Sequence, residues 1–298
     1  MNDKKANLVV TDPPYNVNYE GSAGKIKNDN MANEAFYEFL LSALTNTEAA
    51  MAQDASVYVF HADTEGLNFR KAFSDAGFYL SGTCIWKKQS LVLGRSPYQW
   101  QHEPVLFGWK KKGKHNWYAD RKQTTIWEFE KPKKNSDHPT MKPVALVAHP
   151  ILNSSLSNCI VLDPFGGSGS TLIACEQTQR ICYTIELDEK FCDVIVKRYI
   201  EQAGKDDDVF LLRNDVEQRY RDLPEINKPT AFKAKDSSYS KEMADYAVGF
   251  IECLAHTKGT WAGKPFELID WQEQIIRDLF GTLKPNGYRQ FNTAYGMS

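Results

Sequence analysis

Four consecutive residues near the N-terminus, Asp12-Pro13-Pro14-Tyr15, combine a carboxylate, two prolines and an aromatic ring. The prolines lack a backbone N–H and fix φ, so the carbonyl of Pro13 is presented rigidly and without competing donors. Asp12 adds a second acceptor, and Tyr15 adds a flat surface for stacking. We therefore take these four residues as candidates for catalysis on a planar amine. A tight turn, stiffened by the prolines and packed by Tyr15, is the structural alternative.

A second candidate site is the stretch VLDPFGGSGSTLIACE at 161–176, which is typical of a strand, a glycine turn and the start of a helix. Its glycines allow a sharp turn and the close approach of a ligand to the backbone. No Lys follows them, so the loop is not a Walker A loop, and the spacing is not G-x-G-x-x-G. Glu186, at the end of the next predicted strand, could accept hydrogen bonds from ribose hydroxyls. Together these features predict a nucleoside cofactor.

The stretch from Cys84 to Lys134 is basic and aromatic, with 12 Lys or Arg against 4 Asp or Glu, although the whole chain has a net charge of −2. Interleaved cations and aromatic rings suit phosphate contacts and base stacking, and a solvated lysine face is the alternative. The candidate phosphate contacts are Lys110, Lys111, Lys112 and Lys114. Arg95 and Gln99 are the candidates for contacts to base edges.

Periodicity predicts the elements that must position these residues. Strands are predicted at 7–11, 56–60, 78–86, 159–163, 181–187 and 209–215, and helices at 33–53, 65–76, 144–155, 171–179 and 189–202. The helix at 144–155 is expected to be kinked or interrupted at Pro150. Alternating strands and helices predict an α/β fold with a doubly wound, mainly parallel sheet. Ligands bind such sheets outside the carboxyl ends of the strands, where both candidate motifs lie.

The composition of the 298 residues, with 42% apolar and 25% charged side chains, is ordinary for a soluble globular protein. No window approaches about 18 apolar residues, so a membrane span is not expected. The N-terminus resembles no signal peptide, and the six cysteines form no C-x-x-C pair. These features favour a cytoplasmic protein without a metal site and without a disulfide framework.

Three motifs in a fixed order resemble the β-class, or permuted, amino-methyltransferases of DNA, over roughly residues 7–220. They are DPPY at 12–15, HPTMKP at 138–143 and DPFGGSGST at 163–171. The stretch between the first two resembles the phage and prophage branch. The resemblance implies a Rossmann-like methyltransferase fold, S-adenosylmethionine as cofactor, double-stranded DNA as partner, and a role of the restriction–modification type. DPPY, in place of the SPPY usual in cytosine-N4 members, implies adenine N6 as target, with cytosine N4 as the alternative.

The resemblance also implies residue roles. Asp12 and the Pro13 carbonyl would hold the target amine, and Tyr15 would stack on the extruded base. The cofactor site would comprise Asp163, Phe165, Gly166, Gly167, Ser168, Gly169, Glu186, His138, Thr140, Lys142 and Asp215. The chain starts almost at DPPY, whereas many relatives carry a segment before it, so the strand at 209–215 could be the substitute that walls the cofactor pocket.

The C-terminal residues 246–295 resemble the start of a phage terminase large subunit, but no Walker loop follows them. We expect a methyltransferase domain at 1–224, with a DNA-recognition region inserted at 84–137. A linker is expected at 225–242, and a short, mainly helical terminase-like segment at 243–298. The alternatives are a DNA-binding module that has lost catalysis, a packaging-associated fusion, and an enzyme that methylates amines of protein or RNA. A homodimer is also considered.

Overall fold

The computed structural model describes residues 4–18, 20–21, 24–25, 29–94, 97–130, 141–213, 216–223, 236–252, 268 and 270–285. The chain divides into two compact units, Met1–Lys205 and Asp206–Ser298. This division falls earlier than the boundary expected after residue 224. Both candidate motifs lie in the first unit. None of the described helices is long and apolar enough to cross a membrane.

The first unit is built on a seven-stranded sheet in the order β7-β5-β6-β4-β1-β8-β9. Its strands are β1 (Ala6–Thr11), β4 (Met51–Phe60), β5 (Phe78–Val92), β6 (Trp100–Lys110), β7 (Ile126–Glu128), β8 (Ile160–Asp163) and β9 (Ile181–Thr184). The pairs β1–β4, β1–β8, β8–β9 and β5–β7 are parallel, and β6 pairs antiparallel with β4 and β5. Among the described strands of this sheet β6 alone is reversed, so the expected mainly parallel sheet is confirmed.

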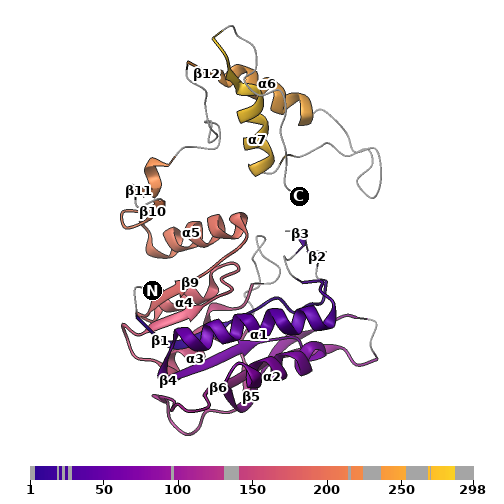
Figure 1. Cartoon of the computed structure of the whole chain (residues 1–298), viewed down its shortest axis with the longest axis vertical. Helices are drawn as coiled ribbons and strands as arrows, with labels where there is room; N and C mark the ends of the chain where they lie inside the picture. Colours follow the sequence, from indigo (N-terminus) through magenta and orange to yellow (C-terminus); the bar gives the residue numbers. More distant parts are fainter. Residues whose placement is uncertain are drawn as a thin grey trace. The chain divides into compact units, whose positions relative to one another are not determined.

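Helices cover both faces of this sheet. They are α1 (Asn33–Ala50), α2 (Gly66–Asp75), which follows the short η1 (Asp63–Glu65), α3 (Val144–Ser154), α4 (Ser170–Gln177) and α5 (Glu189–Ala203). Side chains from α1 and α2 form one core with β1 and β4, and side chains from α3 and α4 form a second core on the other face. Figure 1 shows α1 running across the sheet. The doubly wound α/β architecture is therefore confirmed.

The helix α3 decides one of two expectations, because it continues through Pro150, so the interruption is wrong while the kink stays a prediction. Pro150 is itself buried, next to Leu146, Val147 and Ile151, which pack into the second core. Helices in proteins owe most of their stability to packing of this kind, so the burial of one face outweighs the hydrogen bond that proline cannot donate.

In the expected recognition region at 84–137, β5 and β6 belong to the sheet itself, and residues 131–137 lie outside the described residues. Since β6 runs against its neighbours, its first residues lie at the edge where the parallel strands end. The loop between β5 and β6 therefore projects from the same edge as the candidate motifs. The turn after β6 lies at the opposite edge, where the backbone N–H of Lys114 bonds to the Gln53 carbonyl near the start of β4.

The second unit corrects the expectation for 209–215. The strand β10 (Phe210–Arg213) is not part of the seven-stranded sheet, since it pairs antiparallel with β11 (Val216–Arg219). A short apolar run can form its strand hydrogen bonds with the strand that follows it in the chain. The side chains of Phe210 and Leu212 in this run stay exposed. The short η2 (Tyr220–Asp222) follows.

The remaining described elements of the second unit are β12 (Ser238–Tyr239), α6 (Lys241–Glu252), α7 (Asp270–Gly281) and β13 (Thr282–Leu283). The strand β12 falls within the expected linker and pairs with β13, and α6 and α7 pack together. In the first unit a further hairpin joins β2 (Glu20–Gly21) to β3 (Gly24–Lys25). Residues 225–235 of the expected linker lie outside the described residues.

Candidate active site

The two candidate motifs meet at one edge of the sheet, because β1 and β8 are parallel neighbours. Asp12 follows β1, and Asp163 ends β8. A hydrogen bond joins the strand ends, since the Thr11 hydroxyl donates to Asp163 Oδ1 at 2.7 Å. The sheet thus brings together residues more than a hundred positions apart, as the carboxyl-end rule for ligand sites predicts.

Both carboxylate oxygens of Asp12 accept hydrogen bonds within the site. The Tyr15 hydroxyl donates to Oδ1 at 2.6 Å, and the Lys142 ammonium donates to Oδ2. Lys142 Nζ also lies over the Tyr15 ring, 5.2 Å from its centroid. Burial, together with the nearby carboxylates of Asp12 and Glu103, raises the pKa of Tyr15 well above its usual value, so its hydroxyl stays a donor.

Glu103, on the reversed strand β6, belongs to the same cluster although no sequence motif pointed to it. Its carboxylate accepts from the Tyr15 hydroxyl at 3.2 Å and lies 3.4 Å from Lys142 Nζ and 2.6 Å from Lys88 Nζ. Burial by itself would raise the pKa of Glu103, but the ammonium groups of Lys142 and Lys88 outweigh burial and hold it below its ordinary value. Only the direction of β6 brings this residue to the site.

Lys142 connects the two motifs through its backbone and its side chain. It lies just before α3, and its carbonyl accepts a hydrogen bond from the Ser170 hydroxyl at 3.0 Å, at the start of α4. Its side chain is only 8% exposed. Burial would lower the pKa of Lys142, but Asp12 and Glu103 raise it above its ordinary value. Lys142 therefore stays charged in the centre of the site, next to the residues expected to hold the target.

The glycine loop has the conformation that its sequence predicts. Gly167 and Gly169 have φ of +51° and +80°, which favour glycine. A Cβ at Gly166 would lie 2.4 Å from Thr184 Oγ1, so the loop lies close against the end of β9. A Cβ at Gly167, by contrast, would meet no described atom within 4 Å. The backbone at Gly167 is thus open to a ligand.

Glu186 is held beside this loop, as the predicted ribose contact requires. Its Oε2 accepts from the Gly167 N–H and its Oε1 from the Asp188 N–H, both at 2.7 Å. Arg198 of α5, which sequence reasoning missed, donates to the Ser168 carbonyl and to its hydroxyl, the latter at 3.2 Å. The residues present therefore fit a nucleoside cofactor, because the turn at Gly167 is open, Glu186 is an acceptor next to it, and Arg198 fixes the loop by hydrogen bonds.

Asp163 and Phe165 anchor the loop from inside. Asp163 is buried, and burial raises its pKa to about 7 in spite of hydrogen bonds from Thr171, Thr11 and the Phe165 N–H. The Phe165 ring lies 5.8 Å from that of Phe39. The Asp163 carboxyl thus positions the loop through internal contacts. Three other predicted cofactor residues, His138, Thr140 and Asp215, lie outside the described residues.

One of the four predicted phosphate contacts, Lys110, needs correction. The Lys110 side chain is 8% exposed and pairs with Glu48 at 3.2 Å, so it is not available to a phosphate. Lys111, Lys112 and Lys114 are exposed, but they follow the end of β6. Seven residues of strand separate Glu103 from Lys110, or about 23 Å. The reversal of β6 therefore moves this lysine turn to the edge opposite the site.

The loop between β5 and β6, by contrast, lies beyond the end of β6 that carries Glu103, and its described residues expose apolar side chains. Leu93 is 85% and Tyr98 is 90% exposed. Gln99 is half-buried, and its side-chain oxygen accepts from the Gly94 N–H at 2.7 Å, so it holds the loop together. Arg95, the other predicted base contact, lies outside the described residues.

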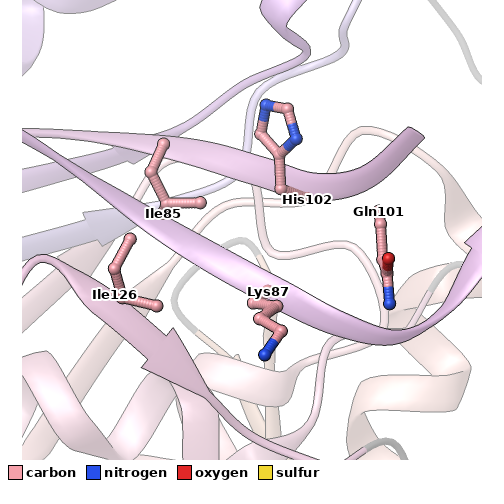
Figure 2. A pocket seen from close by; sticks show the side chains of 5 residues that line it. All are labelled: Ile85, Lys87, Gln101, His102 and Ile126. Carbon is pink, nitrogen blue, oxygen red and sulfur yellow. The ribbon is translucent and has the colours of Figure 1, made fainter. Parts of the chain in front are cut away.

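An open hollow of about 390 Å³ lies beside this loop, between β5, β6 and β7. Figure 2 shows the five side chains that line it, which are Ile85, Lys87, Gln101, His102 and Ile126. His102 directly precedes Glu103, and neighbouring side chains of a strand point to opposite faces of the sheet, so the hollow lies on the face opposite to Glu103. Within the part of the chain that the structure describes, no cluster of three or more His, Cys, Asp or Glu residues could hold a metal ion.

Comparison with protein families gives a match to the N6_N4_Mtase model, described as DNA methylase, over residues 6–197. The type II methyltransferase M.HpaI of Haemophilus parainfluenzae is 25% identical over 220 residues, covering 66% of this chain and 69% of the relative. The DNA adenine methyltransferase YhdJ of Escherichia coli (strain K12) is 24% identical over 230 residues, covering 65% and 76%.

Two solved structures share the fold. The M1.HpyAVI–SAM complex superposes with a TM-score of 0.53 at 24% identity, covering 66% of this chain and 90% of that one. The PvuII DNA methyltransferase, described as cytosine-N4-specific, has a TM-score of 0.51 at 16% identity, covering 68% and 89%.

Proposed function

The chain belongs to the N6_N4 family of DNA methylases, and we propose from this premise that it transfers a methyl group from S-adenosylmethionine to adenine N6 in double-stranded DNA. The observation that carries the proposal is the juxtaposition of Asp12 with the glycine loop. The 2.7 Å bond from Thr11 to Asp163 fixes the ends of β1 and β8 relative to each other. An amine bound at Asp12 would therefore lie next to a cofactor bound at Gly167.

The cofactor, when bound, supplies a methyl group on a positively charged sulfur. We propose that Gly167 and its neighbours approach it by their backbone and that Glu186 accepts from its ribose hydroxyls. The roles of His138, Thr140 and Asp215 rest on the sequence resemblance alone.

For the target base, we propose extrusion from the duplex, at a cost of a few kcal/mol, with Tyr15 stacking on the freed ring. The Asp12 carboxylate and the Pro13 carbonyl each accept one hydrogen of the amine, and Pro14 keeps the turn rigid. Because the nitrogen lone pair is delocalised into the ring, two acceptors that favour a tetrahedral nitrogen make it a better nucleophile. Positive charge develops on this nitrogen, and fixed acceptors stabilise that charge without reorganising.

For DNA binding, we place the interface at the loop between β5 and β6, since it projects from the same edge as Asp12. Its exposed Leu93 and Tyr98 suit the space that an extruded base leaves in the duplex, where they would stack on the neighbouring bases. Apolar side chains enter between bases in this way in other DNA-binding proteins. Lys87 and His102 extend this surface into the hollow of Figure 2.

The test is transfer of tritiated methyl groups from S-adenosylmethionine to a mixed DNA pool, followed by nucleoside chromatography and mapping of the site. We expect N6-methyladenine, because DPPY resembles the adenine members of the family. N4-methylcytosine would correct the target and leave the site intact. Equal labelling by the wild type and an Asp12→Ala variant, or labelling of RNA or protein alone, would overturn the proposal.

The names of the relatives also suggest a type II restriction–modification role, which we propose for this chain. The kinship to the phage and prophage branch and the terminase-like nature of residues 243–298 stay proposals from sequence. A cytoplasmic location is proposed as well, and the described cysteines are all free thiols. A homodimer would be detected as a doubled mass in light scattering.

A further inference from the structure

The donors that occupy Asp12 are the starting point. The Tyr15 hydroxyl donates a hydrogen bond to one oxygen of Asp12, and the Lys142 ammonium donates to the other. The Lys142 ammonium also lies over the Tyr15 ring. Under the proposed function, the target base would use two of these groups, the Asp12 carboxylate and the Tyr15 ring. An amine that binds Asp12 therefore shares this carboxylate with a buried, charged lysine, which weakens Asp12 as an acceptor for the amine.

A second acceptor stands within reach of both donors. Glu103 Oε2 lies 3.4 Å from Lys142 Nζ and 3.2 Å from the Tyr15 hydroxyl. Neither donor would need to leave the cluster in order to release Asp12, because each already contacts Glu103. A lysine ammonium has three donor hydrogens on a flexible stem, so a shift of this kind needs only a change of rotamer.

The charges of the cluster balance. Asp12 and Glu103 carry one negative charge each, and Lys142 and Lys88 carry one positive charge each. If Glu103 were neutral, Asp12 would be the single carboxylate paired with the buried Lys142. An unpaired buried charge is costly, so Lys142 would then hold Asp12 tightly.

We propose, resting on the proposed function, that Glu103 is a positioning residue that takes over Lys142 and the Tyr15 hydroxyl when the target amine binds Asp12. Asp12 and Glu103 act as two alternative acceptors for the same pair of donors. In the free enzyme the donors are shared, with Asp12 favoured. In the complex with DNA they move to Glu103, and Asp12 is left to the amine.

The first test is a Glu103→Gln variant of the full chain, measured for single-turnover methyl transfer to the mapped DNA site and for cofactor binding by calorimetry. We expect transfer to fall about tenfold or more, because Lys142 then has one carboxylate left, Asp12, and holds it more tightly against the amine. The calorimetry separates this effect from a change in cofactor binding, because Lys142, which the resemblance places in the cofactor site, contacts Glu103 whereas Gly167 and Glu186 do not.

The matched control is Asp75→Asn. Asp75 likewise accepts from a tyrosine hydroxyl, that of Tyr37, and from a lysine, Lys71, each at 2.7 Å. It lies exposed on α2, outside the cluster, and its loss should leave methyl transfer at the level of the wild type.

The decisive readout compares two duplexes, one with adenine at the target position and one with unsubstituted purine, which has no exocyclic amine. If the target proves to be cytosine, 2-pyrimidinone replaces purine. Glu103→Gln should weaken binding of the duplex with the amine and leave binding of the other unchanged, because only an amine uses the Asp12 carboxylate that Lys142 then holds more tightly. A structural role of Glu103 would weaken both equally, and that result would overturn the proposal.

A charge-balanced variant covers the case in which Glu103→Gln fails to fold. Glu103→Gln combined with Lys88→Met removes one charge of each sign and should show the same amine-specific defect. Wild-type binding of the amine duplex by this variant would overturn the inference. If the wild type itself transfers no methyl group to DNA, the proposed function fails first and the inference falls with it.

Discussion

At the scale of the residue, Asp12 is the group that the proposed chemistry depends on most. Asp12→Ala should reduce turnover by about 10²–10³-fold, by analogy with the removal of one oxyanion-hole donor. Cofactor affinity should stay near that of the wild type, because Gly167 and Glu186 lie in the loops that follow other strands, β8 and β9. Rates of methyl transfer and calorimetry with S-adenosylmethionine check this prediction. A variant that transfers methyl groups at the normal rate would remove Asp12 from the mechanism.

Asp163 predicts a dependence of stability on pH. Burial raises its pKa from the ordinary 3.8 to about 7. Between these values the unfolded chain releases this proton while the folded chain keeps it, so the free energy of unfolding falls as pH rises. Above about pH 7 the loss is complete and constant. Asp163→Asn removes this titration. The urea midpoint of the wild type should therefore decrease relative to that of the variant as the pH rises from 4 to 7. Parallel profiles would contradict the assignment.

At the scale of the element, substitutions of glycine can distinguish the stability lost through backbone strain from the cofactor affinity lost through a displaced loop. Gly169→Ala should destabilise the protein by about 1–2 kcal/mol, because a side chain at this positive φ is strained. Its Cβ would also lie 3.0 Å from Ile195 of α5, so the loop must shift and cofactor affinity should fall.

The control for that substitution is Gly204→Ala. Gly204 has φ of +70° and would bring its Cβ within 4 Å of no described atom. It should cost a similar stability in urea unfolding without any effect on calorimetric cofactor binding. Equal losses of cofactor affinity in the two variants would show that the Ile195 contact is irrelevant.

The direction of β6 makes a prediction about DNA. Tyr98→Ala, in the loop at the edge of the site, should weaken DNA binding about tenfold through lost stacking. The triple change of Lys111, Lys112 and Lys114 to Ala, at the opposite edge, should change neither affinity nor its salt dependence. Fluorescence anisotropy at several salt concentrations distinguishes the two sets. A reduced salt slope for the triple variant would return the interface to the lysine turn.

At the scale of the whole molecule, the described residues of the site lie within the unit Met1–Lys205. Deletion of residues 229–298 should therefore leave methyl transfer and thermal stability of the first unit unchanged. Tritium transfer by the shortened chain, compared with the full chain at equal concentration, measures this. Loss of activity in a shortened chain that still folds would show that the second unit contributes to catalysis.

The sequence by itself determined the local chemistry of this protein. Prolines at 13 and 14, glycines at 166, 167 and 169, and the alternation of strands and helices predicted an acceptor array and a cofactor turn at one edge of a parallel sheet. These features depend on φ restriction and on hydrophobic period, which act over a few residues and can be read from their order.

Only the tertiary structure decided which distant residues meet. Glu103 lies in the same cluster as Asp12, and the turn with Lys111, Lys112 and Lys114 lies at the opposite edge of the sheet, because β6 runs opposite to its neighbours. The run at 209–215 looked like another strand of the series but pairs with β11. Strand direction and partner choice result from packing and loop closure across the whole sheet. The local pattern of a strand is the same whichever way it runs, so the sequence reading could predict the strand but not its neighbours.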